Sequence, residues 1–173
     1  MLLLFFQPVK PSPLPIWVNV PFVAQPRNGC GAASVAMVMQ YWAAQQRLPL
    51  TAAARVENIQ KQIFSRKRHG ATPAAMESYL SQHGFLVFGV HGSWQLLHQQ
   101  LEKGRPLIVA IRPPAQHELH YVVIDGIDPI KEQILMNDPE VRKLLPEERK
   151  EFEKDWRATH NWMLLAVPQA ANR

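Results

Sequence analysis

The chain has a single cysteine, Cys30, among its 173 residues. One cysteine excludes an internal disulfide, so packing must hold the fold together, and Cys30 must serve packing, metal ligation or reactivity. Because there is no CxxC pair, the sequence does not indicate a structural zinc site. A GxxxxGK[ST] phosphate-binding loop is also missing. We therefore expect no cofactor and no bound metal.

Long apolar runs are absent as well. The chain begins with six apolar residues, MLLLFF, followed by a proline-rich stretch up to Pro15, without the basic start and small-residue cleavage site of a signal peptide. No other segment approaches the roughly 18 uncharged apolar residues of a membrane span. We expect a proline-rich arm or signal remnant at 1–16, a single domain at 17–173 and no transmembrane segment. As written the protein would be soluble and cytoplasmic, whereas a start codon further upstream would make it exported or periplasmic.

The charge is mildly basic, with a net charge of +5 and a pI of about 9.6. The densest basic cluster, Arg66 to His69, has no interleaved aromatic residues, so we expect a solvated loop and no nucleic-acid partner. The oligomeric state is left open. With 47% hydrophobic residues, the chain is long enough to bury a sizeable core.

Helical patterns dominate the first part of the chain. Residues 31–46 are apolar on nearly every face and have no proline or further glycine, which predicts a buried central helix. Two more helices are expected over 51–64 and from Thr72, each opened by a threonine cap. A fourth helix is expected with Ser93 as its cap and ends at Gly104.

Strand patterns dominate the second part. A short strand is expected near 17–22 and another at 85–90. The β-branched and apolar runs after Gly104 predict strands at 105–111, 120–127, 133–138 and 162–167, interrupted by one amphipathic helix over 146–156. This order predicts an α+β fold in which helices precede a mostly antiparallel sheet.

Cys30 lies between two glycines at the start of the expected central helix, in the stretch NGCGAAS. A helix amino terminus lowers the pKa of a thiol, which favours a nucleophile. Flanking glycines let the backbone turn sharply and let a substrate chain approach. Taken alone, the position fits an inert buried thiol as well.

A nucleophilic cysteine needs a base, and seven histidines compete for that role. His117 and His120 flank the start of a strand in HELHYVVIDGI, a spacing that matches no common metal motif. The others are expected at the surface or as caps: His69, His83, His91, His98 and His160.

Geometry selects His120. If 120–127 and 133–138 form a hairpin with its turn near residues 129 and 130, His120 falls opposite Asp138, with an uncertainty of one or two residues that still leaves the side chains within reach. An aspartate beside a histidine fixes its tautomer and stabilises its charged form. Asp125 in mid-strand and Asp128 in the far turn are weaker candidates for this orienting role.

The remaining requirement is a donor for the oxyanion that forms when a thiolate attacks a carbonyl. Gln25, five residues before Cys30, is placed to present its amide to the space that the Cys30 backbone N–H faces.

The ordered set of Gln25, Cys30, His120 and Asp138 resembles papain-like cysteine peptidases of the bacteriocin-processing type, the double-glycine leader peptidases. The matching stretches are VPFVAQPRNGCGAASVAMVMQYW, HYVVIDGI, ILMNDP and EERKEFEKDW, with a closing apolar strand, from about Val20 to Val167. The resemblance implies a papain-like fold with the cysteine helix against the sheet. It also implies the roles of nucleophile for Cys30, base for His120, orienter for Asp138 and oxyanion donor for Gln25.

The resemblance further implies a peptide or protein substrate, since members of the family often cut after a Gly-Gly pair. Many members are fused to a membrane transporter with an ATPase, and the sequence shows neither part, so it is closer to stand-alone relatives. Gly29 also differs from the acidic or bulkier residue that often precedes the cysteine. Two alternatives stay open: an amidase, deamidase or acyltransferase on the same fold, and a catalytically silent peptide-binding module.

Overall fold

The computed structural model describes residues 14–114 and 119–169. Most of the expected arm at 1–16, and His117, lie outside the described residues. Within them, no helix is both long and apolar enough to cross a membrane.

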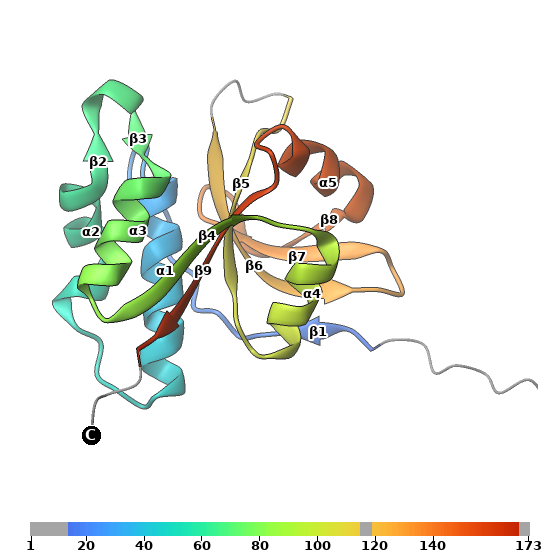
Figure 1. The fold of residues 1–173 in the computed structure, drawn as a ribbon, viewed down its shortest axis with the longest axis horizontal. Coiled ribbons are helices and arrows are strands. Elements are labelled where there is room, and N and C mark those ends of the chain that lie inside the picture. Colours follow the sequence, from blue (N-terminus) through green and yellow to red (C-terminus); the bar gives the residue numbers. More distant parts are fainter. Residues whose placement is uncertain (1–13, 115–118, 170–173) are drawn as a thin grey trace, which may run out of the picture.

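The helices gather in two places around one large sheet (Figure 1). The α-helices are α1 (Cys30–Gln45), α2 (Val56–Ile63), α3 (Pro73–Gln82), α4 (Trp94–Glu102) and α5 (Arg149–Arg157), with 3-10 turns at Ala52–Ala54 and Arg66–Arg68. The first three helices form a layer beside the sheet, and α4 and α5 pack against its other parts.

The main sheet has seven strands, and neighbours pair antiparallel in the order β4-β9-β5-β6-β7-β8, with β1 beside β6. Its strands are β1 (Ile16–Trp17), β4 (Phe85–His91), β5 (Leu107–Ile111), β6 (His120–Asp128), β7 (Gln133–Asp138), β8 (Arg142–Glu148) and β9 (Trp162–Pro168). A separate hairpin joins β2 (Phe64–Ser65) to β3 (Gly70–Ala71). The predicted α+β class is confirmed.

The helix α1 is buried along most of its length, as the sequence predicts. Ten of its residues are buried, and its side chains pack on the strands β5, β6 and β9. At its far end the Trp42 indole N–H donates to the Ala166 carbonyl of β9 at 2.9 Å. Burial on nearly all faces fixes α1 in place, so the position of its first residue is well defined.

Two of the three expected side-chain caps are confirmed. The Thr72 hydroxyl accepts from the Ala75 N–H at 3.2 Å, with Pro73 opening the helix, and the Ser93 hydroxyl accepts from the Leu96 N–H. The prediction for Thr51 was wrong, because its side chain makes no capping hydrogen bond and a 3-10 turn precedes α2.

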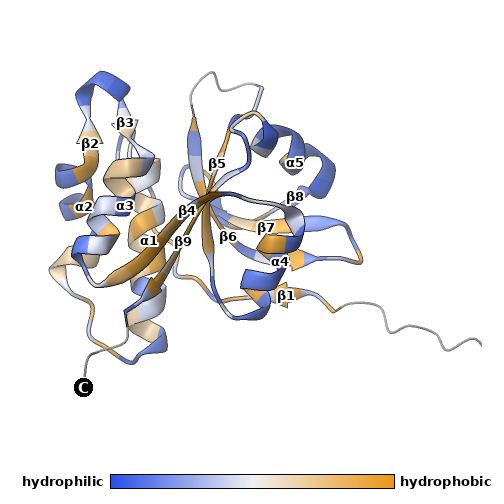
Figure 2. Ribbon diagram, in the orientation of Figure 1, coloured by the Kyte–Doolittle hydropathy of each residue, from blue (hydrophilic) through white to orange (hydrophobic). Residues whose placement is uncertain are grey.

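The strand β6 is the centre of the sheet and is buried from His120 to Ile127. It pairs with β5 near its start and with β1 near its end, while β7 lies along its other side. Figure 2 shows that the middle strands are hydrophobic whereas α5 is largely hydrophilic. A buried central strand is a rigid support for a residue at its first position.

Two expected boundaries were wrong. The strand at 17–22 is only the two-residue β1, because Val20 and its neighbours leave the sheet to become core and loop. The expected helix over 146–156 begins at Arg149, since Pro146 to Glu148 belong to the edge strand β8, where a proline is tolerated. The basic cluster forms the turn of the β2–β3 hairpin.

Candidate active site

Cys30 is the first residue of α1, and a tight turn leads into it. Asn28 has a left-handed backbone (φ 54°), and the Gly29 N–H donates to the Pro26 carbonyl at 2.9 Å. A Cβ on Gly29 would lie 2.6 Å from the Pro26 ring, so no larger residue fits this turn. The thiol is half-buried and free, on a helix amino terminus whose first N–H groups have no partner within the helix.

Gly31, on the other side of the cysteine, is a packing residue. A Cβ there would lie 2.7 Å from the Ala71 Cβ and 3.0 Å from the Met76 sulfur. The expectation that both glycines open space for a substrate is therefore corrected, since their own neighbours fill the space next to each of them. Gly29 allows the tight turn over Pro26, and Gly31 allows the start of α1 to lie close to the β2–β3 hairpin and α3.

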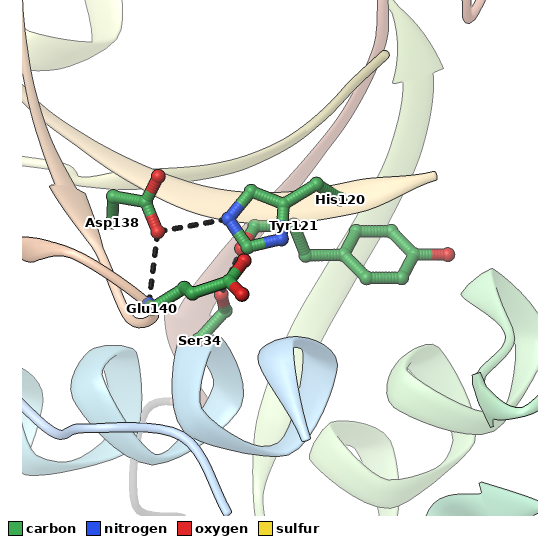
Figure 3. A network of polar contacts seen from close by, with 5 residues as sticks. All are labelled: Ser34, His120, Tyr121, Asp138 and Glu140. Carbon is green, nitrogen blue, oxygen red and sulfur yellow. Dashed lines mark hydrogen bonds and ion pairs between the residues drawn. The ribbon is translucent and has the colours of Figure 1, made fainter. Parts of the chain in front are cut away.

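A buried hydrogen bond joins the cysteine helix to the strand of the histidine. The hydroxyl of Ser34, one turn after Cys30, donates to the Tyr121 carbonyl at 3.3 Å (Figure 3). Tyr121 directly follows His120 in β6. Ser34 thus fixes the first turn of α1 against the first residues of β6, and its place on an otherwise apolar helix was a signal that the sequence analysis missed.

His120 and Asp138 are in direct contact. The imidazole Nε2 lies 2.8 Å from Oδ1 of Asp138, and both side chains are nearly inaccessible to solvent (Figure 3). The Asp138 carboxylate also accepts from the Glu140 N–H at 2.9 Å. With Nε2 engaged by Asp138, the other ring nitrogen, Nδ1, is left for a further partner.

The hairpin register that led to this pair is two residues from the expected one. Val123 pairs with Asn137 instead of residue 135, because the turn lies further along the chain than expected, with Asp128 opposite Gln133. The bulge between Ile124 and Gly126 takes back one residue of that shift. In this register His120 falls opposite residue 140, so Asp138 is a diagonal neighbour. The juxtaposition holds because diagonal side chains on one face remain within reach.

The electrostatics of the pair favour a charged imidazole. Burial by itself would lower the pKa of His120, but the hydrogen bond to Asp138, the interaction with the Cys30 side chain and the charges of both outweigh it and raise the pKa to about 10. Burial acts to raise the pKa of the Asp138 carboxyl. The hydrogen bond and charge of His120, together with the backbone N–H groups of Glu140 and Val141, act to lower it and outweigh burial, so the pKa of Asp138 lies below its ordinary value. The two groups stabilise each other as an ion pair.

Gln25 is held next to this pair by its backbone. Its N–H donates to the carbonyl of Pro139, the residue after Asp138, at 2.9 Å. Its side-chain oxygen Oε1 is buried and makes no hydrogen bond within the described part of the chain. Leaving a buried acceptor without a partner costs about 1–3 kcal/mol, so the position of this amide needs a reason other than stability.

One cavity of about 700 Å³ brings these residues together. Gln25, Cys30 and His120 lie on its wall, and Asp138 is buried behind His120. Other wall residues come from distant segments and were not predicted from the sequence: Asn28, Arg68, Gly70, Ala71, Thr72, Pro73, Arg112, Leu119, Tyr121 and Glu140. His69 is exposed in its turn, as expected, and also lies on this wall.

The weaker candidates lie elsewhere. Asp128 caps the β6–β7 turn, accepting from the N–H groups of Ile130 and Lys131. Asp125 is fully buried in β6, and neither carboxylate oxygen has a hydrogen-bond partner among the described residues. Burial raises the pKa of Asp125 to about 8, although the charge of Lys143 acts to lower it. Asp138 is therefore the aspartate that the fold places at His120.

The described residues hold no group of three or more His, Cys, Asp or Glu side chains close enough together to bind a metal ion. The chemistry that the cavity offers comes from a thiol, an imidazole–carboxylate pair and an amide. This combination is typical of thiol hydrolases, in which a cysteine attacks and a histidine moves the proton.

Several solved structures of peptidases share this fold. A putative C39-like peptidase from Bacillus anthracis matches with a TM-score of 0.69 at 17% identity, covering 90% of this chain and 98% of the other. The peptidase domain of Streptococcus ComA, a bifunctional ABC transporter involved in quorum sensing, matches with a TM-score of 0.67 at 19% identity, covering 87% and 100%.

A third structure is a double glycine motif protease from an AMS/PCAT transporter in complex with a leader peptide. It matches with a TM-score of 0.64 at 20% identity, covering 90% of this chain and 98% of the other. No curated protein sequence matches the chain significantly. The architecture is thus that of the C39 class of peptidases.

Sequence comparison agrees with the fold. The model of the family described as "Peptidase_C39 like family" matches residues 17–163. The match spans most of the chain, and the chain belongs to this family of C39-like peptidases.

Proposed function

We propose that this chain is a cysteine peptidase that hydrolyses a peptide bond with Cys30 as nucleophile, His120 as general base and acid, and Asp138 as the residue that orients His120. The observation that carries the proposal is the 2.8 Å contact between Nε2 of His120 and Oδ1 of Asp138. Cys30 lies on the wall of the same cavity as His120, and its side chain contributes to the raised pKa of the imidazole. Membership of the C39-like peptidase family supports the same reaction class.

The first half of the reaction forms an acyl-enzyme. In the resting state the proton of the Cys30 thiol is already on His120, whose pKa is raised to about 10, and Nδ1–H is the donor that faces away from Asp138 because Nε2 is bonded to it. The thiolate attacks the carbonyl carbon of the scissile bond, and the bond electrons move to the oxygen. The imidazolium then protonates the leaving amine as the C–N bond breaks, which leaves a thioester on Cys30.

Gln25 and the Cys30 backbone N–H stabilise the negative oxygen in this proposal. The N–H group of Cys30 lies at the amino terminus of α1, where the helix dipole favours negative charge. Because the Gln25 oxygen is buried, the amide NH2 is the end of the side chain left to face the cavity. A donor of this kind lowers the activation barrier by on the order of 3 kcal/mol.

The second half of the reaction returns the enzyme to its starting state. Neutral His120 takes a proton from water, the hydroxide attacks the thioester carbon, and the cysteine leaves as a thiolate beside the imidazolium, which restores the resting pair. Asp138 keeps the imidazole in one orientation through both halves.

We propose peptides with a Gly-Gly pair before the cleaved bond as the first substrates to test. The support is the likeness to a double glycine motif protease that was solved with a leader peptide. An amidase or acyltransferase would share the acyl-enzyme half of the reaction, so the substrate panel has to separate these classes.

The test is a set of variants assayed on Gly-Gly peptides, glutamine-containing peptides and peptidoglycan fragments. Cys30→Ala should abolish turnover, and Gln25→Ala should lower kcat by about 10²- to 10³-fold with little change in KM. His98→Ala is the matched control, because His98 pairs with Glu102 on α4 away from the cavity.

Alkylation checks the nucleophile without knowledge of the substrate. Iodoacetamide should modify Cys30 at neutral pH faster than free cysteine, and His120→Ala should slow the reaction while His98→Ala leaves it unchanged. Equal rates for all of these proteins and for free cysteine would contradict the proposed function.

A further inference from the structure

The wall of the catalytic cavity carries positive charge from two separate segments. Arg68 and His69 belong to the turn between β2 and β3, whereas Arg112 follows the last residue of β5. In Figure 1 the turn rises from the layer of α1–α3, and the end of β5 belongs to the sheet. Two arginines thus reach the same cavity from the two layers that hold Cys30 and His120.

The segments that hold these arginines are fixed by the backbone. The β2–β3 hairpin pairs Phe64 with Ala71 and Ser65 with Gly70, and the turn closes through His69, whose backbone is left-handed (φ 52°). The N–H of Arg112 donates to the Asp155 carbonyl at 3.1 Å. The positive charges therefore belong to the formed cavity and not to a long free tail.

Neither Arg68 nor Arg112 is neutralised by a neighbour within residues 14–114 and 119–169, since no ion pair there involves either side chain. The turn with Arg68 is among the most hydrophilic parts of the molecule in Figure 2. An exposed guanidinium normally has only water around it, but one on the wall of a substrate cavity is available to a ligand.

One carboxylate, that of Glu140, lies on the described part of the cavity wall. Its backbone N–H is bonded to Asp138, and Figure 3 shows its side chain next to His120. Glu140 is thus confined to the end of the cavity near the imidazole. Counted over the described residues alone, the net charge of the wall away from His120 is positive.

We infer that the substrates of this site are peptides that carry an aspartate or glutamate side chain within the segment bound in the cavity, with Arg68 and Arg112 as the specificity-determining residues. The inference rests on the proposed function for the position of the peptide. A guanidinium donates two parallel hydrogen bonds to a carboxylate, so it distinguishes glutamate from the isosteric glutamine. Among the described wall residues Tyr121 is the one phenol or indole ring, too few for the stacked bases of a nucleic-acid surface, which favours a peptide as the carrier of the negative charge.

The experiment measures binding apart from cleavage. Fluorescent peptides that contain Gly-Gly and differ only in Glu, Gln or Lys, at each of several positions on both sides of the pair, are titrated into the Cys30→Ala protein, which binds without turnover. At one or more positions the Glu peptide should bind about fivefold more tightly than the Gln peptide and more tightly still than the Lys peptide. The preference should shrink as salt is added, since the cavity is open to solvent.

Variants assign the preference to the two arginines. Arg68→Gln or Arg112→Gln, each made in the Cys30→Ala protein, should remove most of the Glu-over-Gln difference, and Arg68→Glu should shift the preference toward the Lys peptide. Lys67→Gln is the matched control, because Lys67 is an exposed cation in the same turn that does not line the cavity. It should change the ratio much less.

The outcomes separate this inference from the proposed function. Equal binding of Glu and Gln peptides at every position, or no binding of any acidic peptide, overturns the inference, and wild-type cleavage of the neutral peptides would leave the proposed function standing. Tight, arginine-dependent binding of acidic peptides that the wild type never cleaves supports the inference and counts against the peptidase.

Discussion

Replacing Asp138 separates two effects of its carboxylate on His120, the negative charge and the hydrogen-bond acceptor. Asp138→Asn keeps an acceptor oxygen for the Nε2–H group and removes the charge, whereas Asp138→Ala removes both. At the 2.8 Å separation of Nε2 and Oδ1, a pair of unit charges in an effective dielectric constant of about 20 is stabilised by about 6 kcal/mol. This energy corresponds to a change of about four units in the pKa of His120.

An NMR titration of the histidine side chains measures this change directly. In the wild type His120 should stay protonated through neutral pH and titrate near pH 10. In Asp138→Asn the pKa should fall by about two to four units. It should fall further in Asp138→Ala, because burial then opposes the charge with only Cys30 to support it.

The same interaction sets how stability depends on pH. The pKa of His120 is about 10 in the folded state and 6.5 as the reference for the unfolded state, so the stabilisation is fully present below pH 6.5 and is lost as the pH rises to about 10. Urea denaturation should show a loss on the order of 5 kcal/mol across this range that Asp138→Ala largely lacks. A His120 pKa in both variants within about half a unit of the wild-type value would refute the reasoning.

Three further predictions test parts of the site and its support. Ser34→Ala removes the hydrogen bond between α1 and β6, so kcat should fall without being abolished as in Cys30→Ala, and the alkylation rate of Cys30 should fall with it. An unchanged kcat and alkylation rate would show that packing alone positions α1. Asp125→Asn should be more stable than the wild type by several kcal/mol above pH 8. The pKa of the buried Asp125 carboxyl is raised to about 8, so the wild type loses stability as the pH rises from about 4 to about 8. Urea titrations should show that the advantage of the variant vanishes below pH 4. Gly31→Ala should destabilise the fold by about 1–3 kcal/mol, because its methyl group overpacks against Ala71. Gly70→Ala is the control and should cost less, since its methyl group meets nothing nearer than 3.8 Å. Equal melting temperatures of the two variants would contradict this prediction.

The sequence predicted those features that depend on local patterns. The central helix followed from its unbroken apolar residues, and the caps at Thr72 and Ser93 followed from their position before helical segments. The pairing of His120 with Asp138 was reached from the position of one turn. It survived an error of two residues in register because the two side chains meet diagonally across β6 and β7.

Other features depend on partners that are distant in the sequence. Glutamate, lysine and arginine near residue 147 favour a helix, yet pairing with β7 draws Pro146 to Glu148 into a strand. Nothing local indicates that Arg68 and Arg112 share a cavity wall, since they meet only when the helical layer packs on the sheet. The roles of Cys30, His120, Asp138 and Gln25 in catalysis stay predictions that the variants above will test.

The link from Ser34 to Tyr121 also bears on when the protein acquires activity. Cys30 is near the beginning of the described chain and His120 follows only after four helices and β5 have been made, so a nascent or partly unfolded chain has the thiol without its base. The Ser34 bond and the hairpin of β6 and β7 form only in the complete fold. Alkylation of Cys30 at a rate above that of free cysteine can therefore serve as a reporter of folding, since this enhancement should appear only after the last third of the chain has been added.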